Sequence, residues 1–317
     1  MTQDSELLAL LRDVGSDETQ AVESRVDEAS FRRFLAADWS GMPRASTFAT
    51  RDGASLAYRH WPADSDRALV LVHGSAGHGG HLHVLARAIA ARGLAQVYAP
   101  DMRGHGLSCP GPAVSYAQQM RDDIGDLVAR VRERQRPSAI ILGGHSAGGG
   151  LVVRVAASDI ASDVAAYLLL APFLGARAPT TRPGLGGWIR PFPKRIAALS
   201  ALNERGIPWL NQVPVLEFNQ PLAARDGRET LSWPYATMMA FDPGSWKAGL
   251  AGMRGDQSVL VLVGARDECF LPEAYAETVG GLVSHARTEI IGELGHWDLL
   301  VMGDVIDRVT IWLSRLP

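Results

Sequence analysis

The stretch SAIILGGHSAG, residues 138–148, decides the fold of this chain. Residues 138–142 form a short apolar run that predicts a buried strand, and residues 146–157 predict a helix. A G-x-S-x-G pattern between a strand and a helix is typical of a sharp turn that strains the serine backbone and presents its hydroxyl. The amino end of the following helix favours negative charge that develops there. We therefore expect Ser146 to be a nucleophile.

Short apolar runs and helical patterns alternate on both sides of this stretch. We expect strands at residues 68–72, 95–99, 138–142, 165–170, 259–263 and 288–291, and helices at residues 81–92, 115–135, 146–157, 272–280 and 301–313. Such alternation favours an α/β fold with a mostly parallel sheet and helices on both faces. Residues 47–61, with Asp52-Gly53 as a turn, predict a β-hairpin ahead of that sheet.

The alternation stops between Pro172 and about Gln257, in a segment rich in Pro, Gly and Trp. This segment is too long for an ordinary loop, so we expect an inserted cap, or lid, over residues 173–257. The core then comprises residues 46–172 and 258–317. Residues 1–45 predict an N-terminal helical extension that packs on a domain or on a second subunit, so a homodimer is one expectation.

A serine hydroxyl needs a base, and the base needs a group that orients it. His296 follows the last expected strand, and Asp267 follows the strand at 259–263. Ser146, Asp267 and His296 thus all lie at carboxyl ends of parallel strands, where ligand sites of such sheets are found. Glu268 and Asp298 are neighbouring carboxylates that could take the role of Asp267.

Acyl transfer also needs donors for the oxyanion, and two backbone positions are suitable. The N–H of Ala147 directly follows the serine, and Ser75 lies in the glycine-rich loop HGSAGHGG, residues 73–80. Gly74 and His145, next to these donors, are predicted to bind substrate. The loop lacks the Lys followed by Ser or Thr of a Walker phosphate-binding motif.

Four histidines lie close together in the sequence and raise the question of a metal site. They are His73, His78, His81 and His83. No cysteine or carboxylate joins them at ligand spacing, and the H-E-x-x-H motif is absent. We expect neither a metal nor any other cofactor.

The bulk properties narrow the partners and the compartment. The 317 residues carry a formal net charge of −3, so no basic excess indicates nucleic acid as a partner. The two cysteines, Cys109 and Cys269, exclude a disulfide framework and fit a reducing compartment. Residues 1–20 lack the pattern of a signal peptide, and no window reaches the ~18 apolar residues that cross a bilayer. We expect a cytoplasmic protein without stable membrane insertion.

Taken together, several motifs resemble the α/β-hydrolase fold. They are His73-Gly74, the stretch DMRGHGLS at residues 101–108, the serine motif, Asp267 and His296. Within that fold they resemble the branch of monoacylglycerol lipases, lysophospholipases and serine aminopeptidases. The resemblance covers roughly residues 46–315 and implies a cap inserted after the strand that follows the serine helix. It also implies that residues 101–108 are mainly structural, so His105 is expected to pack rather than to catalyse.

These observations predict a serine hydrolase that cleaves carboxylic esters through an acyl-enzyme. The Trp and Met residues of the cap favour a small-molecule ester with an apolar acyl or alcohol group, although the same residues could simply form the core of the cap. Amide, lactone or carbon–carbon bond hydrolysis on the same scaffold is an alternative. A hydrolase-like receptor with little turnover is a third hypothesis. The sequence does not identify the natural substrate.

Overall fold

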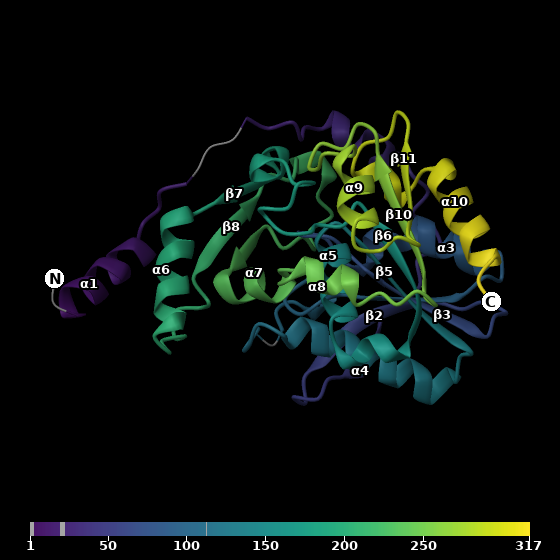
Figure 1. The fold of residues 1–317 in the computed structure, drawn as a ribbon, viewed down its shortest axis with the longest axis horizontal. Coiled ribbons are helices and arrows are strands. Elements are labelled where there is room, and N and C mark those ends of the chain that lie inside the picture. The colour runs from purple at the N-terminus through teal and green to yellow at the C-terminus, as the bar shows by residue number, and fades with distance from the viewer. Residues whose placement is uncertain (1–2, 20–22, 112) are drawn as a thin grey trace.

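The computed structural model describes residues 3–19, 23–111 and 113–317, and an eight-stranded sheet lies at its centre (Figure 1). The strand order is β1-β2-β4-β3-β5-β6-β10-β11. The strands are β1 (Ser46–Ala49), β2 (Ser55–Trp61), β3 (Arg67–Val72), β4 (Gln96–Pro100), β5 (Ala139–His145), β6 (Val164–Leu170), β10 (Ser258–Gly264) and β11 (Arg287–Ile291). The predicted α/β class is confirmed, and each predicted strand is present to within three residues at its ends.

The sheet is parallel except at one edge. β2 pairs with β1 and with β4 in antiparallel fashion, and the other neighbours are parallel. Asp52-Gly53 makes the turn between β1 and β2, as predicted, and Gly53 has the positive φ of 81° that such a turn requires. The central strands β3, β5 and β6 are buried along nearly their whole length, because helices cover both faces of the sheet.

The helices of the core form two layers around this sheet. α3 (His83–Ala91) and α10 (Gly303–Ser314) contact each other on one side, and α4 (Gln119–Gln135) and α5 (Ala147–Ala156) contact each other on the other (Figure 1). α9 (Ala274–Gly280) lies before β11. Short 3₁₀ turns complete the core: η2 (Gly79–Leu82), η3 (Gly106–Ser108), η4 (Asp159–Asp163) and η7 (Trp297–Leu300).

Two predicted helix starts were wrong for local reasons. The helix expected from residue 115 begins at Gln119, because the side chain of Gln119 accepts the backbone N–H of Ser115 at 2.6 Å and holds that stretch as a turn. The helix expected from residue 81 begins as the 3₁₀ turn η2, where His78 accepts the backbone N–H of Gly80 as an N-cap.

The segment between β6 and β10 contains a second, three-stranded sheet in the order β7-β8-β9. Its strands are β7 (Ile189–Pro191), β8 (Pro214–Phe218) and β9 (Ser232–Pro234). Its helices and turns are η5 (Pro183–Gly187), α6 (Pro193–Glu204), η6 (Leu222–Ala224), α7 (Tyr235–Phe241) and α8 (Trp246–Ala251). α8 packs on α5 of the core. The division into cap and core at residues 173–257 stays a prediction.

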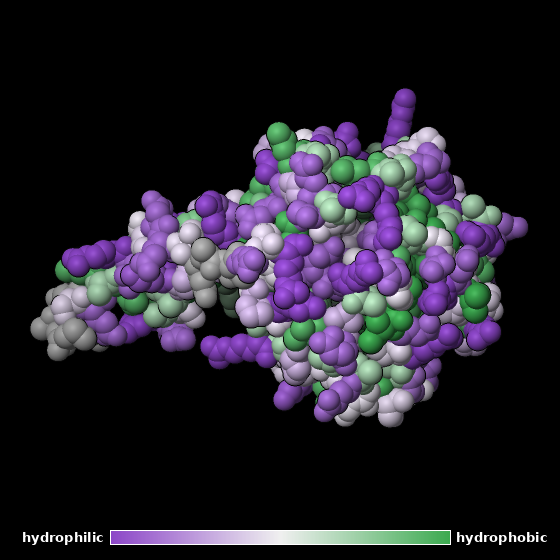
Figure 2. All heavy atoms as spheres, turned by 90° about the horizontal axis from the view of Figure 1, so that it is seen from above, coloured by the Kyte–Doolittle hydropathy of each residue, from purple (hydrophilic) through white to green (hydrophobic). Residues whose placement is uncertain are grey.

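The N-terminal residues run along this inserted segment and then reach the core. α1 (Gln3–Val14) packs on α6, and Arg205 pairs with Glu6 at 2.7 Å. These helices project from the body of the molecule, whose upper face mixes hydrophilic and hydrophobic side chains (Figure 2). η1 (Ala29–Phe31) and α2 (Arg32–Leu35) lie against η7 of the core. The described part of the extension is therefore helical at both ends, and it contacts both the inserted segment and η7.

Candidate active site

Ser146 occupies the turn between β5 and α5, with φ 55° and ψ −121°. This backbone conformation is strained for a residue with a side chain. The neighbouring glycines make it possible, because a Cβ at Gly144 would lie 2.4 Å from the carbonyl oxygen of Gly148. A Cβ at Gly148 would lie 2.4 Å from the carbonyl oxygen of His73. The G-x-S-x-G spacing is thus explained by backbone packing.

His296 and Asp267 form a buried hydrogen-bonded pair. Nδ1 of His296 donates to Oδ2 of Asp267 at 2.8 Å, and both residues are 2% exposed. The other carboxylate oxygen, Oδ1, accepts the backbone N–H groups of Cys269 and Phe270 at 2.9 and 2.8 Å. With its proton on Nδ1, the neutral ring keeps the lone pair of Nε2 free to accept a proton.

The two competing carboxylates bind backbone groups of the same loop. Glu268 accepts the backbone N–H of His296 at 2.8 Å, and burial raises the pKa of Glu268. Asp298 accepts the backbone N–H of Gly295 at 2.8 Å and pairs with Arg33 at 2.6 Å. Both residues therefore fix the loop that carries His296, whereas Asp267 bonds to the ring.

A small cavity joins these groups. Its volume is about 30 Å³, and its lining consists of His73, Gly74, Ser75, Gly77, His81, Leu82, His145, Ser146, Trp188, His296, Trp297 and Leu300. This volume is close to the share of one water molecule in the liquid, and far below the several hundred Å³ of a typical ligand pocket. Side chains must therefore move before an ester can reach Ser146.

Of the two predicted oxyanion donors, Ser75 lines this cavity, and Ala147 directly follows Ser146, which also lines it. In the described part of the chain, the backbone N–H groups of Ser75 and Ala147 have no hydrogen-bond acceptor. The side chain of Ser75 accepts the indole N–H of Trp188 at 2.9 Å, so the inserted segment holds the oxyanion loop. Unpartnered amides beside a nucleophile are suited to stabilise a developing negative charge.

The two predicted substrate-binding residues also line the cavity, with different roles. A Cβ at Gly74 would lie 3.1 Å from Cβ of Ser146, so a side chain there would crowd the serine. His145 donates from Nε2 to the carbonyl oxygen of His296 at 3.1 Å. Burial lowers the pKa of His145 well below its ordinary value. The structure thus shows His145 bracing the backbone of His296.

His73 and His105 use both of their ring nitrogens in hydrogen bonds, which supports the packing role predicted for His105. His73 donates to the carbonyl of Gly74 and accepts the N–H of Met102. His105 donates to the carbonyl of Arg103 and accepts the indole N–H of Trp233 at 2.8 Å. Burial lowers the pKa of His73 to about 4 and that of His105 to about 3. Both rings are neutral and have both nitrogens bonded.

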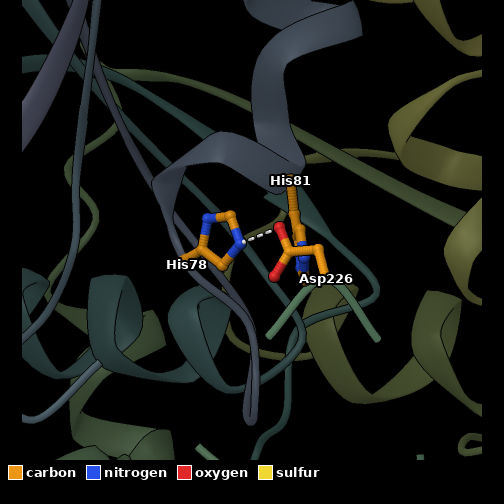
Figure 3. Close-up of side chains that lie close together, drawn as sticks. All are labelled: His78, His81 and Asp226. Atoms are coloured by element: carbon orange, nitrogen blue, oxygen red, sulfur yellow. Dashed lines mark hydrogen bonds and ion pairs between the residues drawn. The ribbon is translucent and has the colours of Figure 1, made fainter. Parts of the chain in front are cut away.

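His78, His81 and Asp226 lie together beside the cavity, and Asp226 comes from the inserted segment (Figure 3). Their nearest ligand atoms lie within 4.8 Å of one another. Local spacing did not indicate this carboxylate, because it is 148 positions from His78 in the chain.

The hydrogen bonds of this cluster define its chemistry. Gly80 donates to Nδ1 of His78 at 3.1 Å, so a neutral ring carries its proton on Nε2, which donates to Asp226 at 2.9 Å. That bond lowers the pKa of Asp226. A metal ligand would need a free lone pair at Nε2. The cluster is therefore a link between the inserted segment and the core, and the expectation of no metal stays a prediction.

Sequence reasoning pointed to the tryptophans of the inserted segment as a group, but it missed Trp297 and Phe31. Trp188 comes from the inserted segment and Trp297 follows His296, and their rings lie 5.1 Å apart in a T-shaped arrangement. Phe31 of the N-terminal segment packs on Trp297, with ring centroids 4.1 Å apart. These residues carry no motif, and the contacts between them join three distant parts of the sequence.

Part of the chain is similar to a known lipase. A stretch of 110 residues is 37% identical to a monoacylglycerol lipase of Mycolicibacterium smegmatis, over 33% of this chain and 39% of the lipase. The chain thus matches less than half the length of this relative.

Solved structures of similar fold cover more of the chain. A monoacylglycerol lipase of Paleococcus ferrophilus superposes with a TM-score of 0.61 at 19% identity, over 83% of this chain and 99% of that one. A soluble variant of a monoglyceride lipase of Saccharomyces cerevisiae gives 0.66 at 14% identity, over 87% and 95%. At these identities the likeness shows the fold.

The family comparison covers most of the chain. A family model described as serine aminopeptidase, S33, matches residues 63–297, a range that includes Ser146, Asp267 and His296. Among the residues that the structure describes, no helix is both long and apolar enough to cross a membrane. From the match and the sheet topology together, the chain belongs to this S33 family of α/β hydrolases.

Proposed function

We propose that the chain hydrolyses carboxylic esters, with Ser146 as nucleophile, His296 as general base and Asp267 as the group that orients His296. One observation carries the proposal. The 2.8 Å bond between His296 Nδ1 and Asp267 favours the tautomer whose Nε2 can accept a proton, in a ring that lines the same cavity as Ser146.

The reaction proceeds in two steps. His296 takes the proton of Ser146 while Oγ bonds to the ester carbonyl carbon, and the N–H groups of Ser75 and Ala147 hold the oxyanion. The carbonyl re-forms as the alcohol leaves with the proton from His296. A water molecule, deprotonated by His296, then attacks the acyl-enzyme, and the acid and free Ser146 are released. No cofactor takes part.

The lining of the cavity supports a small ester with an apolar group as substrate. Trp188, Trp297 and Leu300 supply apolar surface beside Ser146. Similarity to a monoacylglycerol lipase favours an ester over an amide, a lactone or a carbon–carbon bond. Ser146, His296 and Asp267 could also hydrolyse an amide, a lactone or a carbon–carbon bond. A panel of substrates that contains each type of bond separates these reactions from ester hydrolysis. A cytoplasmic location and a homodimer stay predictions.

The direct test is Ser146→Ala with p-nitrophenyl acetate and butyrate. Turnover should fall by about 10³-fold or more, because the nucleophile is lost and the remaining donors catalyse weakly. Ser138→Ala is a matched control, since Ser138 is exposed at the opposite end of the β5 region. That control should retain full turnover. A folded Ser146→Ala protein with the turnover of the unmodified chain would contradict the proposal.

A further inference from the structure

The N-terminal segment is attached to both sides of the active site. On the inserted segment, the N–H of Arg25 donates to the carbonyl of Gly186 at 2.7 Å. On the core, Arg33 donates to the carbonyl of Glu293 at 2.8 Å and pairs with Asp298 at 2.6 Å. Residues 25–33 therefore cross from one side of the active site to the other, beside the loop that carries His296.

Within residues 25–33, Phe31 is the side chain that packs against the tryptophans of the active site. It is 2% exposed, and its ring lies 4.1 Å from that of Trp297 and 6.1 Å from that of Trp188. Both tryptophans line the cavity at Ser146. Phe31 is absent from that lining, so it forms a second layer directly behind the two indole rings.

A hydrogen bond of Trp188 and the chain position of Trp297 restrict the movement of the two tryptophans. Trp188 donates to the side chain of Ser75 at 2.9 Å. Trp297 directly follows His296 in the chain. The cavity of about 30 Å³ can enlarge on this side only if one of these rings retreats, and the ring of Phe31 occupies the space behind them.

We infer that Phe31 determines substrate size, by holding Trp188 and Trp297 against Ser146 so that esters with a short group on this side are preferred. Phe31 is a positioning residue, because it acts through the two tryptophans. This inference rests on the proposed ester hydrolysis. It assigns the N-terminal extension a role in specificity, although residues 1–62 lie outside the family match.

The test compares Phe31→Ala with the unmodified chain on two series of esters. One series is p-nitrophenyl acetate, butyrate and octanoate, and the other is ethyl, butyl and octyl acetate. Phe31→Ala should raise the ratio of kcat/KM for the longest to the shortest ester by at least about tenfold in one series, because each methylene accommodated in an apolar pocket is worth about 10-fold or more. The series that responds identifies whether the acyl or the alcohol group lies against the tryptophans.

Phe48→Ala is the matched control. Phe48 is also 2% exposed, but it lies in β1 at the edge of the sheet, so its removal destabilises the core without changing the site. Phe31→Leu is the second variant, which removes less volume and should shift the same ratio in the same direction. Unchanged ratios in both Phe31 variants, or an equal shift in Phe48→Ala, would overturn the inference.

Failure of the proposed function gives a different result. If the unmodified chain hydrolysed neither series, or if Ser146→Ala retained the turnover, ester hydrolysis by Ser146 would be wrong and this inference would fall with it. If hydrolysis depended on Ser146 but Phe31→Ala and Phe31→Leu kept the original size preference, the inference alone would be wrong.

Discussion

Ser146 is held with φ 55° and ψ −121°, a conformation that costs about 1–3 kcal/mol for a residue with a side chain. The bonds around it maintain this strain. Its N–H donates to the carbonyl of Leu170, and its carbonyl accepts the N–H groups of Gly150 and Phe173. Strain that the surrounding structure fixes so completely is typical of a residue whose orientation matters for function.

Asp267→Asn should show what the carboxylate contributes to His296. The amide oxygen should keep the two backbone N–H bonds that Oδ1 accepts, so the NH₂ group faces Nδ1 and the ring must carry its proton on Nε2 instead. We therefore expect kcat to fall by about 10³–10⁴-fold. The adjacent Glu268→Gln is the control, because Glu268 accepts the backbone N–H of His296. Steady-state kinetics on p-nitrophenyl butyrate measures both. An equal loss in the two variants would contradict the distinct role of Asp267.

Stability should fall in mild acid because burial lowers the pKa of several histidines, among them His105 and His73. The pKa of His105 is about 3 and that of His73 about 4 in the folded protein, whereas an unfolded histidine binds its proton below about pH 6.5. The unfolded state therefore gains protons first as the pH falls. Each histidine should lower the free energy of unfolding by about 2 kcal/mol between pH 7 and pH 5.

Urea unfolding at both pH values measures this loss. His105→Gln should be less stable at pH 7 but should lose about 2 kcal/mol less than the unmodified chain between the two pH values. His285→Gln, at an exposed position, should leave the pH dependence unchanged. Identical pH dependence in all three proteins would contradict the neutral, buried state of His105.

The amino-acid sequence predicted the three residues proposed for catalysis but not the residues around them. The G-x-S-x-G motif indicated Ser146, and position after parallel strands indicated Asp267 and His296. The choice between Asp267 and its neighbours depends on which oxygen reaches the ring, and that is a matter of loop geometry. Asp226 and Phe31 could not be predicted, because no local pattern relates them to the residues that they contact.

At the scale of elements, the turn from β5 to α5 leaves no room for a side chain at Gly148. A Cβ at Gly148 would meet two backbone oxygens, those of His73 and Val72, at 2.4 and 2.5 Å. Backbone cannot yield as a flexible side chain can, so Gly148→Ala should lower the free energy of unfolding by about 3 kcal/mol or more.

Gly255→Ala is the control for this junction, because nothing lies within 4 Å of a Cβ at that position. Its stability should change by less than about 0.5 kcal/mol. The midpoint of urea unfolding gives both values. A Gly148→Ala protein as stable as Gly255→Ala would contradict the packing described for the turn.

The hydrophobic pattern of the sequence predicted the strands of the core better than those of the inserted segment. Strands that are buried on both faces form continuous apolar runs, so all six parallel strands could be predicted. The strands of the inserted segment could not be predicted, because β7 and β9 are three residues long and depend on pairing with β8. The start of α4 was misplaced because a single side-chain bond, from Ser115 to Gln119, decides it.

At the scale of the whole molecule, several hydrogen bonds of the described residues join the inserted segment to the core, and three of them run between side chains. Trp188 donates to Ser75, Trp233 donates to His105, and Asp226 accepts from His78. The N-terminal segment adds a further connection through Arg25 and Arg33. Together these contacts hold the two segments against the core and keep in place the side chains that narrow the cavity at Ser146, Trp188 among them.

Labelling with a fluorophosphonate probe, followed by mass spectrometry of peptides, tests the central claim most directly. The probe reacts with a serine that a neighbouring base activates. The account predicts one adduct, on Ser146, in the unmodified chain and none in Ser146→Ala or His296→Ala. A chain that hydrolyses esters but carries its adduct on another serine, or that leaves Ser146 unlabelled, would contradict it.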